Sequence, residues 1–226
     1  MTETIDLARI GKEAGVPTRE VAGPFGEVMY DQDWSKPCLP KVFDLIRERL
    51  EPGPVPMTGH TDPWVFLAIV YALDLEERFA FAVPSGTHRL VPLARGPEPG
   101  VNVVFKVLEE GDRVFVYFDT DPDQPENKVF PAPGAQDGPP DMTDFQPQEH
   151  SFDAADIPKI VVPEIPTGKH VYFYGDGIFP AHLAVAHELG KGQKSLWVAC
   201  HGKDYACVFC RDGSAEAGDL YPRREF

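Results

Sequence analysis

The chain has 226 residues, of which 42% are apolar, and 21 basic against 36 acidic residues give it a formal net charge of −15. This length fits one large domain or two small ones, and the apolar content is high enough for a packed core, which excludes a globally disordered chain. The acidic excess disfavours general binding of duplex nucleic acid, because that binding needs basic side chains to neutralise phosphates. A small anionic ligand in a locally basic pocket stays compatible with this charge.

The sequence predicts a cytoplasmic protein that does not contact a membrane. Its longest apolar run, residues 64–73, is about half as long as a membrane-spanning helix. The first six residues, Met-Thr-Glu-Thr-Ile-Asp, are acidic where a secretion signal is basic. Four cysteines without such a signal favour a reducing compartment.

Two short elements are predicted near the start of the chain. Residues 1–20 are typical of a short helix with a tail. Residues 41–50 place apolar side chains, among them Val42, Leu45 and Ile46, on one face of a helix, the periodicity of a helix that packs against a core.

An internal repeat, in which aligned residues differ by 116 in number, is the main architectural signal. Gly59 aligns with Gly175 without a gap. The same offset aligns further identical residues: Leu67 with Leu183, Ala68 with Ala184, Leu73 with Leu189, Gly86 with Gly202 and Arg95 with Arg211. The alternative is that two unrelated α/β halves share a common supersecondary pattern.

Each copy has the same predicted order of elements. A strand runs into the glycine, a short turn follows, and then comes an apolar helix of about ten residues. After a charged break, second strands are predicted at 79–83 and 195–199, and third strands at 90–93 and 205–210. The repeat therefore predicts an α/β fold of two tandem units.

The second unit carries additional segments at its start. Two β-rich runs, 101–108 and 113–118, flank a Glu-Glu-Gly-Asp turn and predict a hairpin. Residues 119–148 are rich in Pro, Asp, Gly and Gln and predict a long loop. Residues 153–162 predict a short helix that Pro158 makes irregular.

Short motifs of the second copy suggest a family. They are Ile165-Pro166, Lys169, Gly175-Asp176-Gly177 and the segment from Leu183 that ends in Ala186-His187. In this order, after a hairpin and before a final pair of strands, they resemble the Csx-three family, also called CRISPR ring nuclease three. The resemblance covers about residues 101–213 and, more loosely, 40–96.

The resemblance implies an architecture and a ligand. It implies CARF-like, Csx-three-like α/β units at residues 1–98 and 99–226 that pack as an intramolecular pseudo-dimer, in a monomer or a homodimer. It further implies binding of a cyclic oligoadenylate, above all cyclic tetra-adenylate, in type III CRISPR antiviral defence, and cleavage of this messenger with manganese as the cofactor. The family's Asp-Pro-Arg turn is missing, since residues 84–89 and 200–204 replace it. This departure affects cleavage more than binding.

The glycine turns are the best candidates for a ligand site. A turn that opens a helix presents free backbone N–H groups and the positive end of the helix dipole, and both attract phosphate. The predicted ligand-binding residues are Gly59, His60, Thr61, His88, Arg89, Gly175, Asp176 and Gly177. The alternative is two ordinary tight turns, and Asp176 would repel phosphate unless it caps the helix or holds a metal.

The predicted catalytic residues are His201, Lys203 and His187, and Asp204 is the predicted metal ligand. In a ring nuclease of this kind the 2′-hydroxyl of the ligand attacks the adjacent phosphate. His201 or His187 moves the proton, Lys203 stabilises the charge and Asp204 holds a hard cation. The alternatives are a solvated polar turn at residues 201–204 and a core histidine at His187.

Zinc binding by Cys200, His201, Cys207 and Cys210 is disfavoured. Cys207 and Cys210 lie three residues apart on a predicted strand, which directs their side chains to opposite faces. The same geometry argues against a redox pair, and buried thiols are the preferred interpretation.

Three functions stay open from the sequence. The first is a ring nuclease that binds and degrades a cyclic oligoadenylate. The second is a non-catalytic sensor, sponge or interaction module on the same fold. The third is an unrelated housekeeping protein whose repeat only imitates the family.

Overall fold

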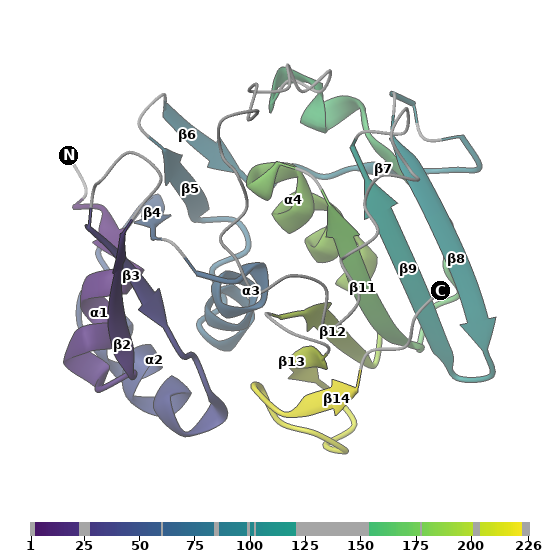
Figure 1. Ribbon diagram of the computed structural model, residues 1–226. Coiled ribbons are helices and arrows are strands. Elements are labelled where there is room, and N and C mark those ends of the chain that lie inside the picture. Colours follow the sequence, from purple (N-terminus) through teal and green to yellow (C-terminus); the bar gives the residue numbers. More distant parts are fainter. Residues whose placement is uncertain are drawn as a thin grey trace.

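The computed structural model describes residues 3–22, 28–59, 61–83, 86–98, 100–101, 103–120, 154–176, 178–200 and 204–222. These residues form a mixed α/β fold in which two central helices lie between a four-stranded and a six-stranded sheet (Figure 1). The predicted α/β class is confirmed. Within the described ranges, no helix is long and apolar enough to cross a bilayer.

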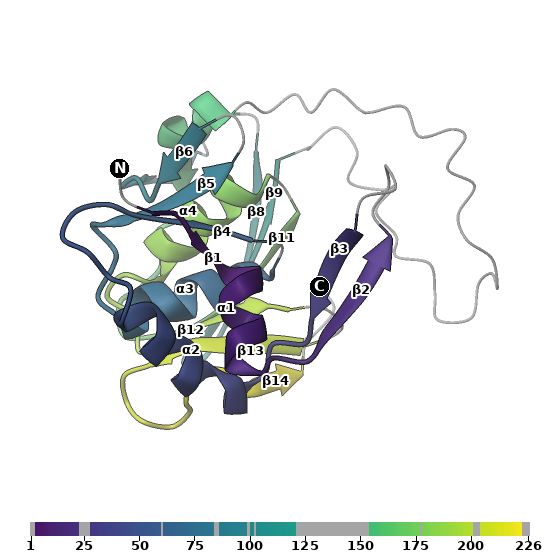
Figure 2. The ribbon, with the colours of Figure 1, turned by 90° about the vertical axis from the view of Figure 1, so that its left-hand side faces the viewer.

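The four-stranded sheet belongs to the first half of the chain and has the order β1-β4-β5-β6. Its first three strands are parallel and β6 is antiparallel to β5. The strands of this half are β1 (Ile5–Asp6), β2 (Thr18–Ala22), β3 (Val28–Gln32), β4 (Val55–Thr58), β5 (Phe79–Val83), β6 (Gly86–Arg89) and β7 (Ala94–Arg95). The helices are α1 (Leu7–Ala14), η1 (Lys36–Cys38), α2 (Leu39–Arg47) and α3 (Pro63–Ala72). Figure 2 shows α1 beside α2, with the β2–β3 hairpin projecting next to them.

The six-stranded sheet belongs to the second half and has the order β14-β13-β12-β11-β9-β8. Its three central strands β9, β11 and β12 are parallel, and antiparallel strands complete it on both sides. The elements of this half are β8 (Val104–Glu110), β9 (Arg113–Asp119), η3 (Ala154–Lys159), β10 (Val161–Val162), β11 (His170–Asp176), α4 (Phe179–Gly190), β12 (Ser195–Ala199), β13 (Asp204–Cys210) and β14 (Leu220–Pro222). Strand β10 pairs with β7 and thereby joins the two halves.

Helix α3 is buried on every side. Seven consecutive residues, Trp64 to Val70, are at most 2% exposed, as expected for a helix that is apolar around its whole circumference. It packs against β12 and β13 of the second half. On its other side the Phe66 ring meets the Phe79 and Phe81 rings of β5 at 6.2 and 5.4 Å between centroids. One hydrophobic core therefore contains residues from both halves.

Most of the predicted elements are confirmed. The second strands have the predicted bounds 79–83 and 195–199, and the predicted hairpin is β8–β9. The helix predicted at 41–50 is α2, and the helix predicted within 1–20 is α1, accompanied by short strands. Residues 121–150, most of the predicted long loop, lie outside the described residues.

Two local predictions are wrong, and a third is confirmed in part. The third strand of the first copy is Gly86–Arg89 rather than 90–93, because residues 86–89 are the ones that pair antiparallel with β5, from Val83 opposite Gly86 to Ala80 opposite Arg89. The irregular helix predicted at 153–162 is present as a shorter 3-10 helix, Ala154–Lys159, which contains Pro158 and is followed by the two-residue strand β10. Finally, Gly175 lies inside β11 rather than in the turn after it.

Candidate functional site

The carboxyl ends of β9, β11 and β12 meet at one edge of the six-stranded sheet, where open α/β sheets bind ligands. The described residues of this carboxyl edge are Asp119, Thr120, Gly175, Asp176, Cys200 and Asp204. Asp119 and Thr120 are only 2% and 4% exposed although both are polar. The Tyr117 hydroxyl donates to Asp119 Oδ2 at 2.9 Å. A buried carboxylate at this position is the strongest polar feature of the edge.

Asp119 was missed by the sequence analysis. The segment 113–118 was recognised as half of a hairpin, but β9 also pairs in parallel with β11. This second pairing places Asp119 opposite Asp176. The available signal was an acidic residue directly after an apolar strand, at the same place as Asp176 in the later strand.

Gly175 has a structural reason to be glycine. A Cβ atom on it would lie 2.7 Å from the Phe118 carbonyl oxygen of β9, closer than any real contact allows. The residue therefore permits two neighbouring strands to approach closely. The predicted phosphate-binding turn begins after it, and Gly177 lies outside the described residues.

The segment between β12 and β13 holds the remaining predicted catalytic residues. Its ends are described: the Cys200 N–H donates to the Asp204 carbonyl oxygen at 3.1 Å, and Asp204 is the first residue of β13. His201 and Lys203 lie between them, outside the described residues. Asp204, the predicted metal ligand, is partly exposed at the carboxyl edge.

The predicted ligand residues of the first copy lie at the end of β4 and on β6. Gly59 has a φ of 145°, and a Cβ there would lie 3.1 Å from Leu7 Cβ, so this turn needs glycine. The Thr61 hydroxyl oxygen is buried and has no hydrogen-bond partner among the described residues. His88 and Arg89 belong to β6, with Arg89 exposed. His60 lies outside the described residues.

His187 belongs to the protein core and does not face the carboxyl edge. Its Nδ1 lies 3.0 Å from the Tyr71 hydroxyl, which also donates to the His187 carbonyl oxygen at 3.2 Å. Burial lowers the pKa of His187 to about 4, with a further contribution from Lys191. The ring is eight residues beyond the start of α4, hence about 12 Å along the helix from the carboxyl edge. The structure therefore does not bring His187 to Gly175 or Asp204.

A second polar contact joins the halves next to His187. Glu188 is 6% exposed, and its carboxylate accepts from Lys191 Nζ at 2.6 Å and Arg95 Nε at 3.3 Å. Arg95 also donates to the Glu188 carbonyl oxygen at 2.6 Å, at the end of α4. Burial raises the pKa of Glu188, but these hydrogen bonds outweigh it and the net shift is downward.

The prediction that Cys207 and Cys210 face opposite sides is wrong. The pairing of β12 with β13 shifts register between Leu196 and Trp197, so that Trp197 pairs with Cys207 and Leu196 with Phe209. This irregularity reverses the alternation of side chains. Both cysteines consequently contact one aromatic cluster on the face of the sheet away from α4. It contains Phe115, Tyr172, Trp197 and Tyr205.

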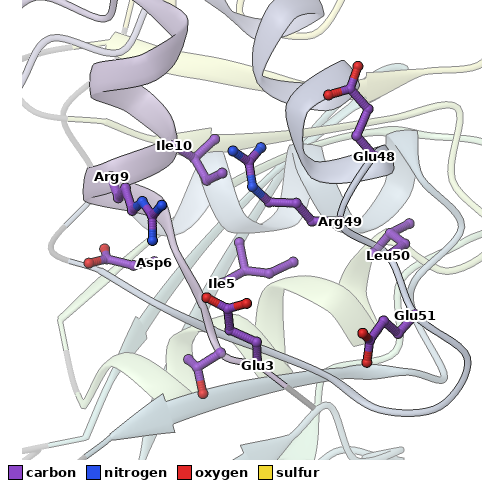
Figure 3. A pocket seen from close by; sticks show the side chains of 10 residues that line it. Glu3, Ile5, Asp6, Arg9, Ile10, Glu48, Arg49, Leu50 and Glu51 are labelled. Carbon is purple, nitrogen blue, oxygen red and sulfur yellow. The ribbon is translucent and has the colours of Figure 1, made fainter.

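A pocket of about 240 Å³ lies elsewhere, between β1, α1 and the end of α2 (Figure 3). It contains none of the predicted site residues. Two arginines, Arg9 and Arg49, line it together with four acidic residues, and both arginines already pair with Glu13 at 3.2 and 2.5 Å. The pocket therefore offers no cation that is clearly available to an anionic ligand.

Comparisons of the chain with models of protein families, with curated proteins and with solved structures found no match.

Proposed function

We propose that this chain binds a cyclic oligoadenylate at the carboxyl edge of the six-stranded sheet, and that its two α/β units pack as a Csx-three-like pseudo-dimer. The proposal rests on the sequence resemblance, and the order of elements is consistent with it. Hairpin, Ile-Pro segment, strand, apolar helix and closing strand pair follow one another from β8 to β13 in the order that the resemblance implies.

The observation that carries the pseudo-dimer is a contact between equivalent residues. Tyr71 and His187 differ by 116 in number, the offset of the repeat, and they are hydrogen-bonded to each other. In a pair related by a twofold axis, only positions near the axis touch their own equivalents. The contact between α3 and α4 therefore supports an axis that passes between these helices.

The equivalent arginines support the same axis. Arg95 of the first copy binds the end of α4. Arg211, its equivalent in the second copy, lies near Tyr71 at the end of α3. Burial raises the pKa of the Tyr71 hydroxyl, and the positive charge of Arg211 partly offsets this rise. Each arginine thus acts on the helix of the other copy.

The chemistry proposed for the edge combines an acidic group with a phosphate ligand. Asp204 and the buried Asp119 supply oxygen ligands of the kind that hard divalent cations such as manganese prefer. Asp204 and Asp119 lie three strands apart in the sheet order, so each would hold a cation separately. A cation between Asp204 and a phosphate removes the repulsion that an acidic edge otherwise exerts on the ligand. Lys203 is proposed to bind the phosphate directly.

A non-catalytic sensor is the second candidate, and one observation favours it. Of the predicted catalytic residues, only His187 is described, and it is buried and hydrogen-bonded in the core. A group held in this way cannot reach a ligand at the surface. If cleavage occurs, it depends on the turn at residues 201–204.

A labelled-messenger assay tests both candidates. The purified chain is incubated with cyclic oligoadenylates of several ring sizes, with and without manganese, and the products are separated. Cleavage supports the ring nuclease, and retention of the intact ring supports the sensor. Lys203→Ala is expected to weaken retention, whereas Lys12→Ala, on the exposed face of α1, is the matched control. Failure to retain a ring of any size rejects the proposal.

A further inference from the structure

A cluster of metal-ligating side chains lies at the opposite end of the six-stranded sheet from the carboxyl edge. His170 is the first residue of β11, Cys210 is the last of β13, and Asp212 lies two residues beyond Cys210. One potential ligand atom from each of these three residues lies within 4.8 Å of the others. Asp112, in the turn between β8 and β9, faces the same histidine. We call these four residues the amino-edge cluster.

The distances from His170 to the two carboxylates fit a shared ion better than direct hydrogen bonds. His170 Nε2 lies 3.5 Å from Asp112 Oδ2 and 3.6 Å from Asp212 Oδ2. Two ligands about 2.1 Å from a tetrahedral zinc ion are about 3.4 Å apart, whereas a direct N–H···O bond is roughly 2.7–3.2 Å long. The Cys210 thiol donates to Asp212 Oδ1 at 3.0 Å and lies 3.3 Å from Ser214 Oγ; binding of an ion would replace this hydrogen bond, because the thiol loses its proton.

The other nitrogen of the histidine is held by a buried partner. His170 Nδ1 lies 2.8 Å from the hydroxyl oxygen of Ser195, which is fully buried and accepts a hydrogen bond from Trp197 Nε1 at 2.8 Å. Metal-binding histidines are typically oriented in this way through the nitrogen that does not bind the metal. When Nδ1 carries the proton and donates it to Ser195, the lone pair of Nε2 points toward two carboxylates. That arrangement is favourable when a cation lies between them.

The charges of the cluster balance with one divalent ion. Two carboxylates and a Cys210 thiolate contribute three negative charges, and Lys194, whose Nζ lies 2.7 Å from Asp112 Oδ2, contributes one positive charge. A divalent cation brings this sum to zero. The Cys210 thiol proton leaves to solvent when the ion binds.

We infer that His170, Cys210 and Asp212 form a structural site for a zinc-class ion, with Asp112 as a neighbouring carboxylate that is paired with Lys194. Thiolate and imidazole ligands select zinc or cobalt over magnesium and manganese. The ion would tie together the start of β11 and the end of β13, which are far apart in the sequence. This site is independent of the proposed ligand site at the carboxyl edge.

Cobalt serves as the spectroscopic probe for this site. The full chain is stripped with a chelator, and cobalt is added while absorbance is recorded. We expect one equivalent of cobalt to produce a thiolate-to-cobalt charge-transfer band, which zinc then abolishes by displacement. Cys210→Ser should lose the band, whereas Cys38→Ser and Cys200→Ser, the matched cysteine controls, should keep it.

Thermal unfolding provides a second readout that does not depend on the thiolate. Zinc should raise the unfolding temperature of the parent chain but not that of Asp212→Asn, a substitution at an exposed side chain. Ser195→Ala should weaken zinc binding by about 10–100-fold through loss of orientation of the histidine. The inference is overturned if the parent shows no charge-transfer band, if Cys210→Ser retains it, or if zinc leaves the unfolding temperature unchanged. The last result would identify the cluster as polar side chains that hold no ion.

Discussion

Removal of the Tyr71 hydroxyl tests the contact between the two halves. The hydroxyl lies 3.0 Å from His187 Nδ1 and 3.2 Å from the His187 carbonyl oxygen, and the ring packs on Phe209 with 4.6 Å between centroids. Tyr71→Phe keeps the ring but leaves the buried imidazole nitrogen without its partner. An unpaired buried polar group costs about 1–3 kcal/mol, so we expect the free energy of unfolding to fall by about 2 kcal/mol.

Urea denaturation followed by tryptophan fluorescence measures this loss by linear extrapolation. Tyr221→Phe is the matched control, because its hydroxyl accepts from Arg113 at 2.8 Å at a more exposed site and should contribute about 0.5 kcal/mol. A double-mutant cycle with His187→Leu should give a coupling energy above about 0.5 kcal/mol. If Tyr71→Phe costs no more than Tyr221→Phe, or if the coupling is zero, the contact does not join the halves as described.

Three further predictions concern the buried groups. The pKa of His182 and of His187 is about 4 in the fold against 6.5 in the unfolded chain. The unfolded state therefore takes up protons first, and unfolding free energy falls by up to about 3 kcal/mol per ring as the pH drops from 6.5 to 4; His182→Leu should flatten this pH profile in urea titrations. Gly175→Ala should cost about 1–3 kcal/mol by urea denaturation, since its Cβ meets backbone of the next strand, and an unchanged midpoint would contradict the close approach. Arg95→Met should lower the free energy of unfolding by about 2 kcal/mol, because the Glu188 carboxylate and carbonyl oxygen each lose a donor. Arg9→Met, at a side chain 70% exposed, should change it by less than about 0.5 kcal/mol. Equal losses in the two variants would refute this prediction.

The elements that sequence patterns predicted well are those with strong local signals. The second strands at 79–83 and 195–199 combine β-favouring residues with charged breaks on their N-terminal sides, and both have the predicted bounds. Helices α3 and α4 are long apolar runs that each contain a proline in the first turn, where proline is favoured. Such features depend on a few neighbouring residues, and the sequence displays them directly.

The predictions that failed depend on partners distant in the sequence. The β6 strand, with Thr87, His88 and Arg89, is too polar to be recognised alone, and its pairing with β5 creates it. The register shift between Leu196 and Trp197 places the side chains of Cys207 and Cys210 on the same face of β13. This shift is a property of the paired strands β12 and β13 and not of either strand alone. At the carboxyl edge, the sequence predicted the ends of β11 and β12 but not the end of β9. Asp119 lies at this edge because β9 pairs in parallel with β11, and the long loop separates these two strands in the sequence.

The complete burial of α3 has a consequence for how the chain is made. On the ribosome the first half emerges with an apolar helix whose main packing surface, β12 and β13, has not yet been synthesised. The N-terminal half therefore cannot complete its core during translation, and its helix stays exposed to other nascent chains until nearly the whole protein has left the exit tunnel. Truncation anywhere before β13 should consequently yield aggregates rather than a smaller folded protein.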